Sequence, residues 1–173
     1  MRILITGGTG LIGRALTEKL KSEGHSVFIL SREGGDFIWS IKDNYMNPLA
    51  VENIDAIVHL AGAGIADKRW SDARKQEIIE SRVYSARLLA DTLLSHPHQV
   101  KTVISASGIG YYGADTGELI CTETSDTGLD FVAICTQGWE KSMESFMAQG
   151  LRVVKLRIGL VMSSQGGIFR VLA

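Results

Sequence analysis

The chain has 173 residues, 45% of them apolar, and a formal net charge of −1 at pH 7. A charge so close to zero argues against binding to nucleic acid or to an anionic membrane surface, and no stretch approaches the ~20 apolar residues that a membrane span requires. The two cysteines, Cys121 and Cys135, predict no disulfide framework. Because the first predicted strand begins within two residues of the N-terminus, we expect no signal peptide and a cytoplasmic location.

A glycine-rich turn follows the first apolar run of the chain. The run at 3–5 reads as a strand, Gly7, Gly10 and Gly13 follow it, and an amphipathic helix is predicted next from the spacing of Ile12, Leu16 and Leu20. Glycine adopts backbone angles closed to other residues and lets a pyrophosphate approach the main chain. The helix start offers unpaired N–H groups and a positive dipole end to that anion. Strand, turn and helix in this order predict a dinucleotide site rather than an ordinary glycine turn.

The end of the second predicted strand bears on the choice between NADP and NAD. An apolar run at 27–30 ends at Ser31 and Arg32. At this place in a dinucleotide fold an acidic residue binds the free 2′-hydroxyl of NAD, whereas an arginine accommodates the 2′-phosphate of NADP. Arg32 therefore favours NADP(H), and Glu33, the competing feature, is expected to face solvent. The alternative for Arg32 is a solvated loop cation.

The rest of the chain alternates strand and helix patterns. Strands are predicted at 37–39, 54–60, 100–105 and 152–158, and helices at 71–95 and 131–149. Ser71 is a suitable N-cap for the first helix, Phe146 and Met147 lie near one apolar stripe of the second, and residues 40–53 read as polar and irregular. The alternation predicts an α/β fold with a doubly wound parallel sheet and right-handed crossovers.

Further motifs span the whole chain and carry a family resemblance. They are His59-Leu60-Ala61-Gly62, Arg69-Trp70 leading to Ser81-Arg82, Ser105-Ala106-Ser107-Gly108-Ile109-Gly110-Tyr111-Tyr112-Gly113, Trp139-Glu140 and Leu156-Arg157-Ile158-Gly159-Leu160-Val161. With the glycine turn, they make the sequence resemble the extended, atypical short-chain dehydrogenases/reductases of the NAD(P)-dependent epimerase/dehydratase family, and within it a nucleoside-diphosphate-sugar epimerase subfamily. The resemblance implies a Rossmann-type fold that binds NADP(H) across the carboxyl ends of the strands. The expected cofactor residues are Gly7, Thr9, Gly10, Leu11, Ile12, Gly13, Ser31, Arg32, Leu60, Ala61 and Gly62.

The chain departs from this family at the catalytic pair. The wider family uses a serine or threonine with a Tyr-x-x-x-Lys pair, in which the ammonium and the cationic nicotinamide lower the pKa of the phenol so that it can exchange a proton. The matching places here hold Cys135 and Trp139, and Lys141 is two positions out of phase. The family mechanism therefore does not transfer directly.

Four residues are the candidates to replace that pair. Ser107 matches the family's serine and would hydrogen-bond a substrate hydroxyl or carbonyl; its alternative is to close the turn into the following loop. Tyr111 or Tyr112 would supply the phenol, or else both rings only pack over the pocket. Glu140 would act as a base if its helix phase points inward, but a solvated helix carboxylate is the favoured interpretation.

Other chemically capable residues are expected to be structural. Cys135 reads as a small core residue, and His59 as a packing residue at the end of its strand. Arg82 is either a surface arginine or a contact for a phosphate or carboxylate. His96 and His98 have no acidic or cysteine companions, so no metal site is predicted.

The expected function is that of an NADP-dependent oxidoreductase or epimerase acting on a small carbonyl or hydroxyl compound, with a nucleotide sugar as one possibility. The alternative is an NADP(H)-binding sensor or scaffold that has lost its chemistry. The apolar run after Gly166-Gly167 stops without a cap, and the resembled family continues further. Residues 1–173 are therefore expected to be the cofactor domain, truncated before most of a substrate-binding lobe. By analogy, helices 71–95 and 131–149 share one side of the sheet and build a homodimer.

Overall fold

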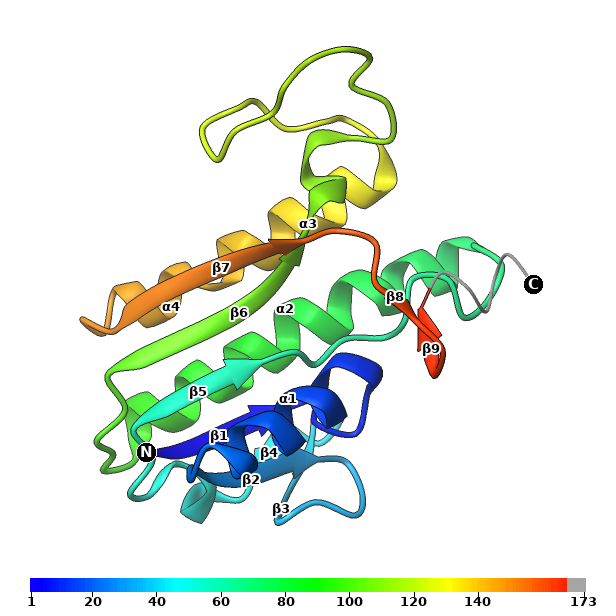
Figure 1. The fold of residues 1–173 in the computed structure, drawn as a ribbon. Coiled ribbons are helices and arrows are strands. Elements are labelled where there is room, and N and C mark those ends of the chain that lie inside the picture. The colour runs from blue at the N-terminus through cyan, green and yellow to red at the C-terminus, as the bar shows by residue number, and fades with distance from the viewer. Residues whose placement is uncertain (168–173) are drawn as a thin grey trace.

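A central sheet of seven strands runs through the computed structural model, which describes residues 1–167 (Figure 1). The strand order is β4-β3-β2-β1-β5-β6-β7, and every neighbouring pair is parallel except β3 and β4. The strands are β1 (Arg2–Thr6), β2 (Ser26–Ser31), β3 (Phe37–Ser40), β4 (Tyr45–Met46), β5 (Ala56–His59), β6 (Thr102–Gly108) and β7 (Arg152–Ile158). The predicted α/β class with a doubly wound parallel sheet is confirmed.

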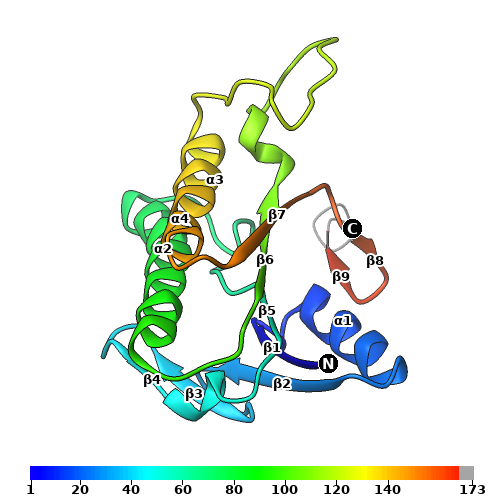
Figure 2. The ribbon, with the colours of Figure 1, turned by 90° about the vertical axis from the view of Figure 1, so that its left-hand side faces the viewer.

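The helices lie on opposite faces of this sheet. Helix α1 (Leu11–Ser22) covers one face, and α2 (Asp72–Ser95), α3 (Phe131–Ser142) and the short α4 (Glu144–Met147) cover the other (Figure 2). The expectation that helices 71–95 and 131–149 share one side is therefore confirmed. Short elements complete the chain: the 3-10 helices η1 (Pro48–Val51) and η2 (Ile109–Tyr112), and a hairpin of β8 (Met162–Ser163) and β9 (Gly166–Gly167).

The structure corrects two details of the predicted elements. The stretch 40–53 is not irregular throughout, because Trp39 pairs with Met46 to make the antiparallel β4, and the Asn47 side chain caps η1. The helix predicted at 131–149 is divided at Met143, whose buried side chain lies between α3 and α4. Both corrections arise from tertiary packing that a local sequence pattern does not report.

Apolar residues are buried on both faces of the central strands. The α1 face holds the smaller cluster, built from Ile3, Ile5, Val27 and Val58. The α2–α3 face holds the larger one, which includes Leu4, Leu30, Ile57, Leu89 and Phe146. Strands buried on both sides need continuous apolar runs rather than alternation, which is the pattern at 3–5 and 27–30.

Two further points from the sequence concern membrane spans and the last residues of the chain. Within residues 1–167, no helix is both long and apolar enough to cross a membrane. The apolar run at the end of the chain, 168–173, lies outside the described residues.

Two adjacent residues of α4 test this packing. Phe146 is fully buried against the larger cluster, whereas Met147, which the sequence placed near the same stripe, is 46% exposed. We expect Phe146→Ala to lower the free energy of unfolding by about 3–5 kcal/mol, because it leaves a cavity in the core. Met147→Ala, the matched control, is expected to change it by less than about 0.5 kcal/mol. Urea denaturation of both variants measures this, and equal losses would contradict the assigned packing.

Candidate cofactor and catalytic site

The glycine turn after β1 forms a tightly packed main-chain cradle. Gly7 has φ +72°, and a Cβ built on it would lie 2.8 Å from the carbonyl of Leu60. A Cβ on Gly13 would collide with the Gly7 carbonyl oxygen. Gly10 is the N-cap of α1, and no side chain caps this helix. The first N–H groups of α1 are therefore left for an anion, which is the arrangement that a pyrophosphate requires.

The segment that follows β5 is fixed to this cradle. Leu60 N donates to the Thr6 carbonyl at 3.0 Å, and Ala61 N donates to Thr6 Oγ1 at 3.2 Å. His59 is fully buried, and its Nδ1 lies 2.8 Å from Thr6 Oγ1. Burial, and then the charge of Arg82, lower the pKa of His59 to about 4, so the ring is neutral at pH 7. His59 is thus the packing residue that the sequence predicts.

The strand order reverses between β1 and β5, since β2 lies beyond β1 on one side and β6 beyond β5 on the other. In open α/β sheets, ligands bind outside the carboxyl ends of the strands at such a point. The structure therefore brings the predicted residues of the glycine turn and of the Leu60-Ala61-Gly62 segment to one edge of the sheet.

Positive charge gathers at the same edge, after β2. Ser31 is buried and donates a hydrogen bond to the Glu33 carbonyl, while Arg32 and Glu33 are exposed. The hydrogen bond from Arg74 lowers the pKa of Glu77, and the charges of Lys68 and Arg32 act in the same direction. Arg32 therefore lies close enough to Glu77 at the start of α2 for their charges to interact.

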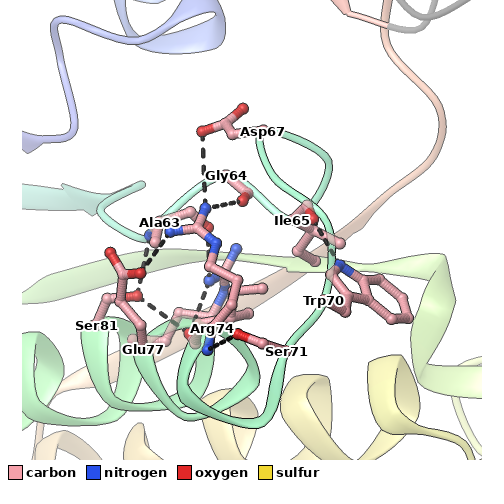
Figure 3. A network of polar contacts seen from close by, with 11 residues as sticks. Ala63, Gly64, Ile65, Asp67, Trp70, Ser71, Arg74, Glu77 and Ser81 are labelled. Carbon is pink, nitrogen blue, oxygen red and sulfur yellow. Dashed lines mark hydrogen bonds and ion pairs between the residues drawn. The ribbon is translucent and has the colours of Figure 1, made fainter.

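A loop at 61–71 closes over the start of α2 through a polar network (Figure 3). Arg74 is buried at its centre, bonded to the Gly64 carbonyl and paired with Glu77 at 2.7 Å. Ala63 N donates to Ser81 Oγ at 2.9 Å, which ties the loop to the middle of α2. Trp70 then packs edge-on against Phe131 at the start of α3. The loop thus links the cofactor edge to both helices of this face.

Ser107 is part of a buried polar cluster between β6, β7 and α3. Its hydroxyl donates to Glu140 Oε1 at 2.6 Å. Arg157 holds the same carboxylate with two hydrogen bonds, Nε to Oε1 at 2.8 Å and Nη2 to Oε2 at 3.1 Å. Such a two-pronged pair fixes the carboxylate in one orientation. The serine hydroxyl is therefore oriented toward α3 and does not merely close the turn into the next loop.

Glu140 is buried, so the favoured interpretation of a solvated helix carboxylate is wrong. Burial raises the pKa of Glu140. Hydrogen bonds from Arg157 and Ser107, together with the charges of Arg157 and Lys155, outweigh this effect, so the pKa falls below its ordinary value. Glu140 is therefore ionised at neutral pH. In this state it accepts the serine proton in a hydrogen bond and leaves the serine lone pairs for another donor.

The two tyrosines lie on η2 and are both half-buried. The Tyr112 hydroxyl donates to the Thr122 carbonyl at 2.9 Å and accepts from Arg157 Nη1 at 2.8 Å. The guanidinium of Arg157 also lies 3.5 Å from the ring centroid of Tyr111. Among the described residues, the Tyr111 hydroxyl has no hydrogen-bond partner, so it is the phenol that is left for a ligand. The catalytic roles of Ser107, Tyr111 and Tyr112 stay predictions.

Cys135 and Trp139 occupy the inner face of α3 beside this cluster. Both are buried, and burial raises the pKa of the Cys135 thiol against the opposing effect of Arg82. Cys135 is thus a core residue, as predicted. Arg82 is also buried, and the alternative of a surface arginine is wrong. Its guanidinium lies 4.8 Å from the ring centroid of Trp139.

Sequence reasoning undervalued Glu140 and missed Arg157. A signal for Glu140 was present, because the spacing of Ala133, Thr136, Glu140 and Met143 places it on a helix face with two apolar residues. The structure buries all four. Arg157 is found only through strand register, since it is the direct neighbour of Ser107 across β6 and β7. A single sequence does not report the pairing of strands 50 residues apart.

A family model and several known proteins match nearly the whole chain. Residues 3–162 match the model of the NAD dependent epimerase/dehydratase family. The chain is 34% identical over 172 residues to the epimerase family protein Mb2239 of Mycobacterium bovis, which covers 97% of this chain and 56% of that protein. It is 30% identical over 175 residues to the epimerase family protein YfhF of Bacillus subtilis, covering 97% and 57%. The chain thus spans little more than half the length of these relatives.

Two solved structures share the fold closely. The nucleoside-diphosphate sugar epimerase from Corynebacterium glutamicum superposes with a TM-score of 0.84 at 35% identity, covering 99% of this chain and 36% of that one. The human epimerase family protein SDR39U1, isoform 2, solved with NADPH, superposes with a TM-score of 0.81 at 32% identity, covering 99% and 58%. The Rossmann-type fold expected from the resemblance is confirmed.

The lowered pKa of Glu140 predicts a specific pH dependence of stability. A carboxylate whose pKa is lower in the folded than in the unfolded chain stabilises the fold above its ordinary value of 4.5, and the contribution is lost as the pH falls through the folded value. We expect Glu140→Gln to reduce the free energy of unfolding by about 2 kcal/mol at neutral pH, and by less at about pH 3. Urea denaturation across this pH range measures the difference.

Glu144→Gln is the matched control, because Glu144 is an exposed carboxylate four residues further along. Its substitution should change stability little at any pH. A constant deficit of Glu140→Gln from neutral to acid pH would contradict the charged pairing of Glu140 with Arg157.

Proposed function

The chain belongs to the NAD dependent epimerase/dehydratase family, and on that premise we propose that it binds NADP(H) along the edge where β1, β5 and β6 end. The observation that carries the proposal is the cradle, in which Gly7 and Gly13 leave no space for a side chain and the start of α1 is uncapped. Gly7, Thr9, Gly10, Leu11, Ile12 and Gly13 would hold the pyrophosphate, and Leu60, Ala61 and Gly62 the adjoining part of the dinucleotide. When bound, the cofactor would supply or accept a hydride.

The preference for NADP(H) over NAD(H) rests on the end of β2. Ser31 and Arg32 stand where a carboxylate would bind the free ribose hydroxyl, and Arg32 is exposed. An arginine offers a planar fork of donors that matches a phosphate. Human SDR39U1, a relative of similar fold, was solved with NADPH, which agrees with this preference.

The reaction that we propose is reduction or epimerisation of a carbonyl or hydroxyl compound, with a nucleotide sugar as the favoured substrate class. Ser107 would orient the reacting oxygen, with its own hydroxyl held by Glu140. The Tyr111 phenol would exchange the proton, because the Tyr112 hydroxyl already makes two hydrogen bonds. Arg157 contacts both the carboxylate and the tyrosine rings, so it would position these groups together.

A second candidate function is a sensor or scaffold that binds NADP(H) without turnover. It is favoured by one observation: the positions that match the family's tyrosine and lysine hold a buried thiol and an indole, Cys135 and Trp139. Neither reproduces a phenol activated by an ammonium. The two functions share the cofactor site and differ only in chemistry.

Removal of the Arg32 guanidinium tests the cofactor preference. We expect Arg32→Ala to weaken NADPH binding by about tenfold or more, because one charge-assisted contact to phosphate is lost, and to leave NADH binding unchanged. Calorimetric titration measures both. Arg87→Ala, an exposed arginine of α2 paired with Asp91, is the control. Tighter binding of NADH than of NADPH by the unaltered chain would refute the preference.

Substitution of Ser107 separates the enzyme from the sensor. NADPH oxidation is followed against a panel of carbonyl compounds, and Ser107→Ala is expected to lower turnover by about a hundredfold with unchanged NADPH affinity. Ser105→Ala should retain activity, because this buried serine of the same strand is bonded, within residues 1–167, only to the Ala106 carbonyl. Tight NADPH binding with no turnover of any compound would instead support the sensor.

A further inference from the structure

Arg82 is a buried cation at the centre of the α2–α3 face. Its side chain is only 6% exposed and lies between the loop that follows β5 and the inner side of α3. A Cβ on Gly62 would be 3.0 Å from Arg82 Cζ, and the ring centroid of Trp139 is 4.8 Å from the same carbon. Gly62 itself is exposed, so only a glycine backbone separates this guanidinium from the sheet edge.

No carboxylate compensates this charge within the described part of the chain. Arg82 Nη1 donates to the carbonyls of Ala63 and Ile78, both at 2.9 Å. Nε is buried without a hydrogen-bond partner, and Nη2 has no acceptor among residues 1–167. Arg74, two turns earlier on the same helix and equally buried, pairs with Glu77 at 2.7 Å and Asp67 at 3.9 Å.

The titratable groups nearest to Arg82 carry no full negative charge at pH 7, and the face of the Trp139 ring compensates the guanidinium only in part. His59 is neutral at pH 7, because burial and Arg82 itself lower its pKa to about 4. Burial raises the pKa of Cys135, and the positive charge of Arg74 adds to the cost that burial places on Arg82. A buried charge without a partner is expensive, and an apolar side chain of similar volume would fill this space at lower cost. The Nη1 contacts attach the loop to α2 but use only one of the three guanidinium nitrogens.

Arg82 lies beside residues that adjoin both the proposed cofactor segment and the proposed catalytic serine. Gly62 continues the segment that packs against the glycine cradle, and Trp139 precedes Glu140, which holds Ser107. The guanidinium thus contacts Gly62, next to the proposed cofactor segment, and Trp139, next to the carboxylate that holds Ser107. The pyrophosphate cradle belongs to α1 on the other face of the sheet (Figure 2), so the two sites are separate.

We propose that Arg82 binds an oxyanion group of the substrate, a carboxylate or a phosphate, through Nε and Nη2. The two nitrogens form one side of the guanidinium fork, which matches two oxygens of a planar or tetrahedral oxyanion. This inference rests on the proposed function, because it assigns the substrate side of that site. It adds that the substrate carries a negative charge close to the reacting oxygen.

The unaltered chain provides a direct test by NMR of its arginine Nε–H groups. Saturated with NADPH, it is titrated with acetate and with inorganic phosphate at constant ionic strength made up with chloride. The resonance of Arg82 is assigned by its loss in Arg82→Lys, and that of Arg74 by its loss in Arg74→Lys. We expect the Arg82 signal to shift saturably and the Arg74 signal, an equally buried Nε–H, to stay in place.

Variants give an independent readout through thermal unfolding. Excluded salts stabilise any folded protein, so the quantity of interest is the difference between variants. The affinity for acetate and phosphate is expected to fall by about tenfold or more in Arg82→Gln, and to be reduced less in Arg82→Lys, which keeps the charge without the fork. Arg74→Gln, the matched control, should retain the anion-dependent rise in midpoint.

Three outcomes would overturn the inference. The first is an Arg82 resonance that is insensitive to both anions, and the second is equal anion stabilisation of the unaltered chain and Arg82→Gln. The third is a tenfold loss of NADPH affinity in Arg82→Gln without any anion effect, which would assign the guanidinium to the cofactor. A chain that binds no NADPH at all would refute the proposed function instead, and calorimetry distinguishes the two failures.

Discussion

The close contact between the Gly7 turn and the end of β5 is the constraint on which the site depends. A Cβ at Gly7 would lie 2.8 Å from the Leu60 carbonyl, so the cradle and the segment after β5 approach each other backbone to backbone. Thr6 and His59 secure this contact through a buried hydrogen bond between adjacent strands. Because this contact fixes the turn, its N–H groups and the start of α1 are preorganised for the anion site that we propose. The segment after β5 then connects the turn to α2 and α3 through its own contacts.

The proposed catalytic residues lie on the opposite face of the sheet from α1, and they are held in place differently from those of the wider family. Where the wider family places a phenol and an ammonium on one helix, this chain has a serine held by a carboxylate, with Arg157 joining that carboxylate to two tyrosines. Arg82 supplies a second positive charge from α2, beside Trp139. Two guanidinium groups thus stand near the site where the family has one lysine. Since neither loses its proton at physiological pH, both serve to hold and orient other groups.

Local pattern was enough to predict the architecture. Apolar runs, the glycine turn and the Ser71 cap placed the main strands, α1 and α2, because these signals depend on neighbours along the chain. The two-residue strand β4 escaped prediction, since it exists only through pairing with Trp39 and Ser40. Glu140 was assigned to solvent because a helix carboxylate usually faces water, and its burial depends on partners from β6 and β7. Arg157 needed the register of β6 against β7, and Arg82 needed the burial of α2, which only the folded chain provides.

Binding of a pyridine dinucleotide to the glycine cradle can be measured directly, and Gly10 offers the variant for it. Its backbone is extended, at φ −77° and ψ 176°, a conformation open to alanine, and the added methyl group would lie on this exposed residue 3.3 Å from the Gly7 carbonyl oxygen. Calorimetric titration with NADPH compares the unaltered chain with Gly10→Ala, each shown to be folded by circular dichroism. We expect saturable binding of NADPH to the unaltered chain and weaker binding to Gly10→Ala. A folded, unaltered chain that binds neither NADPH nor NADH would contradict it.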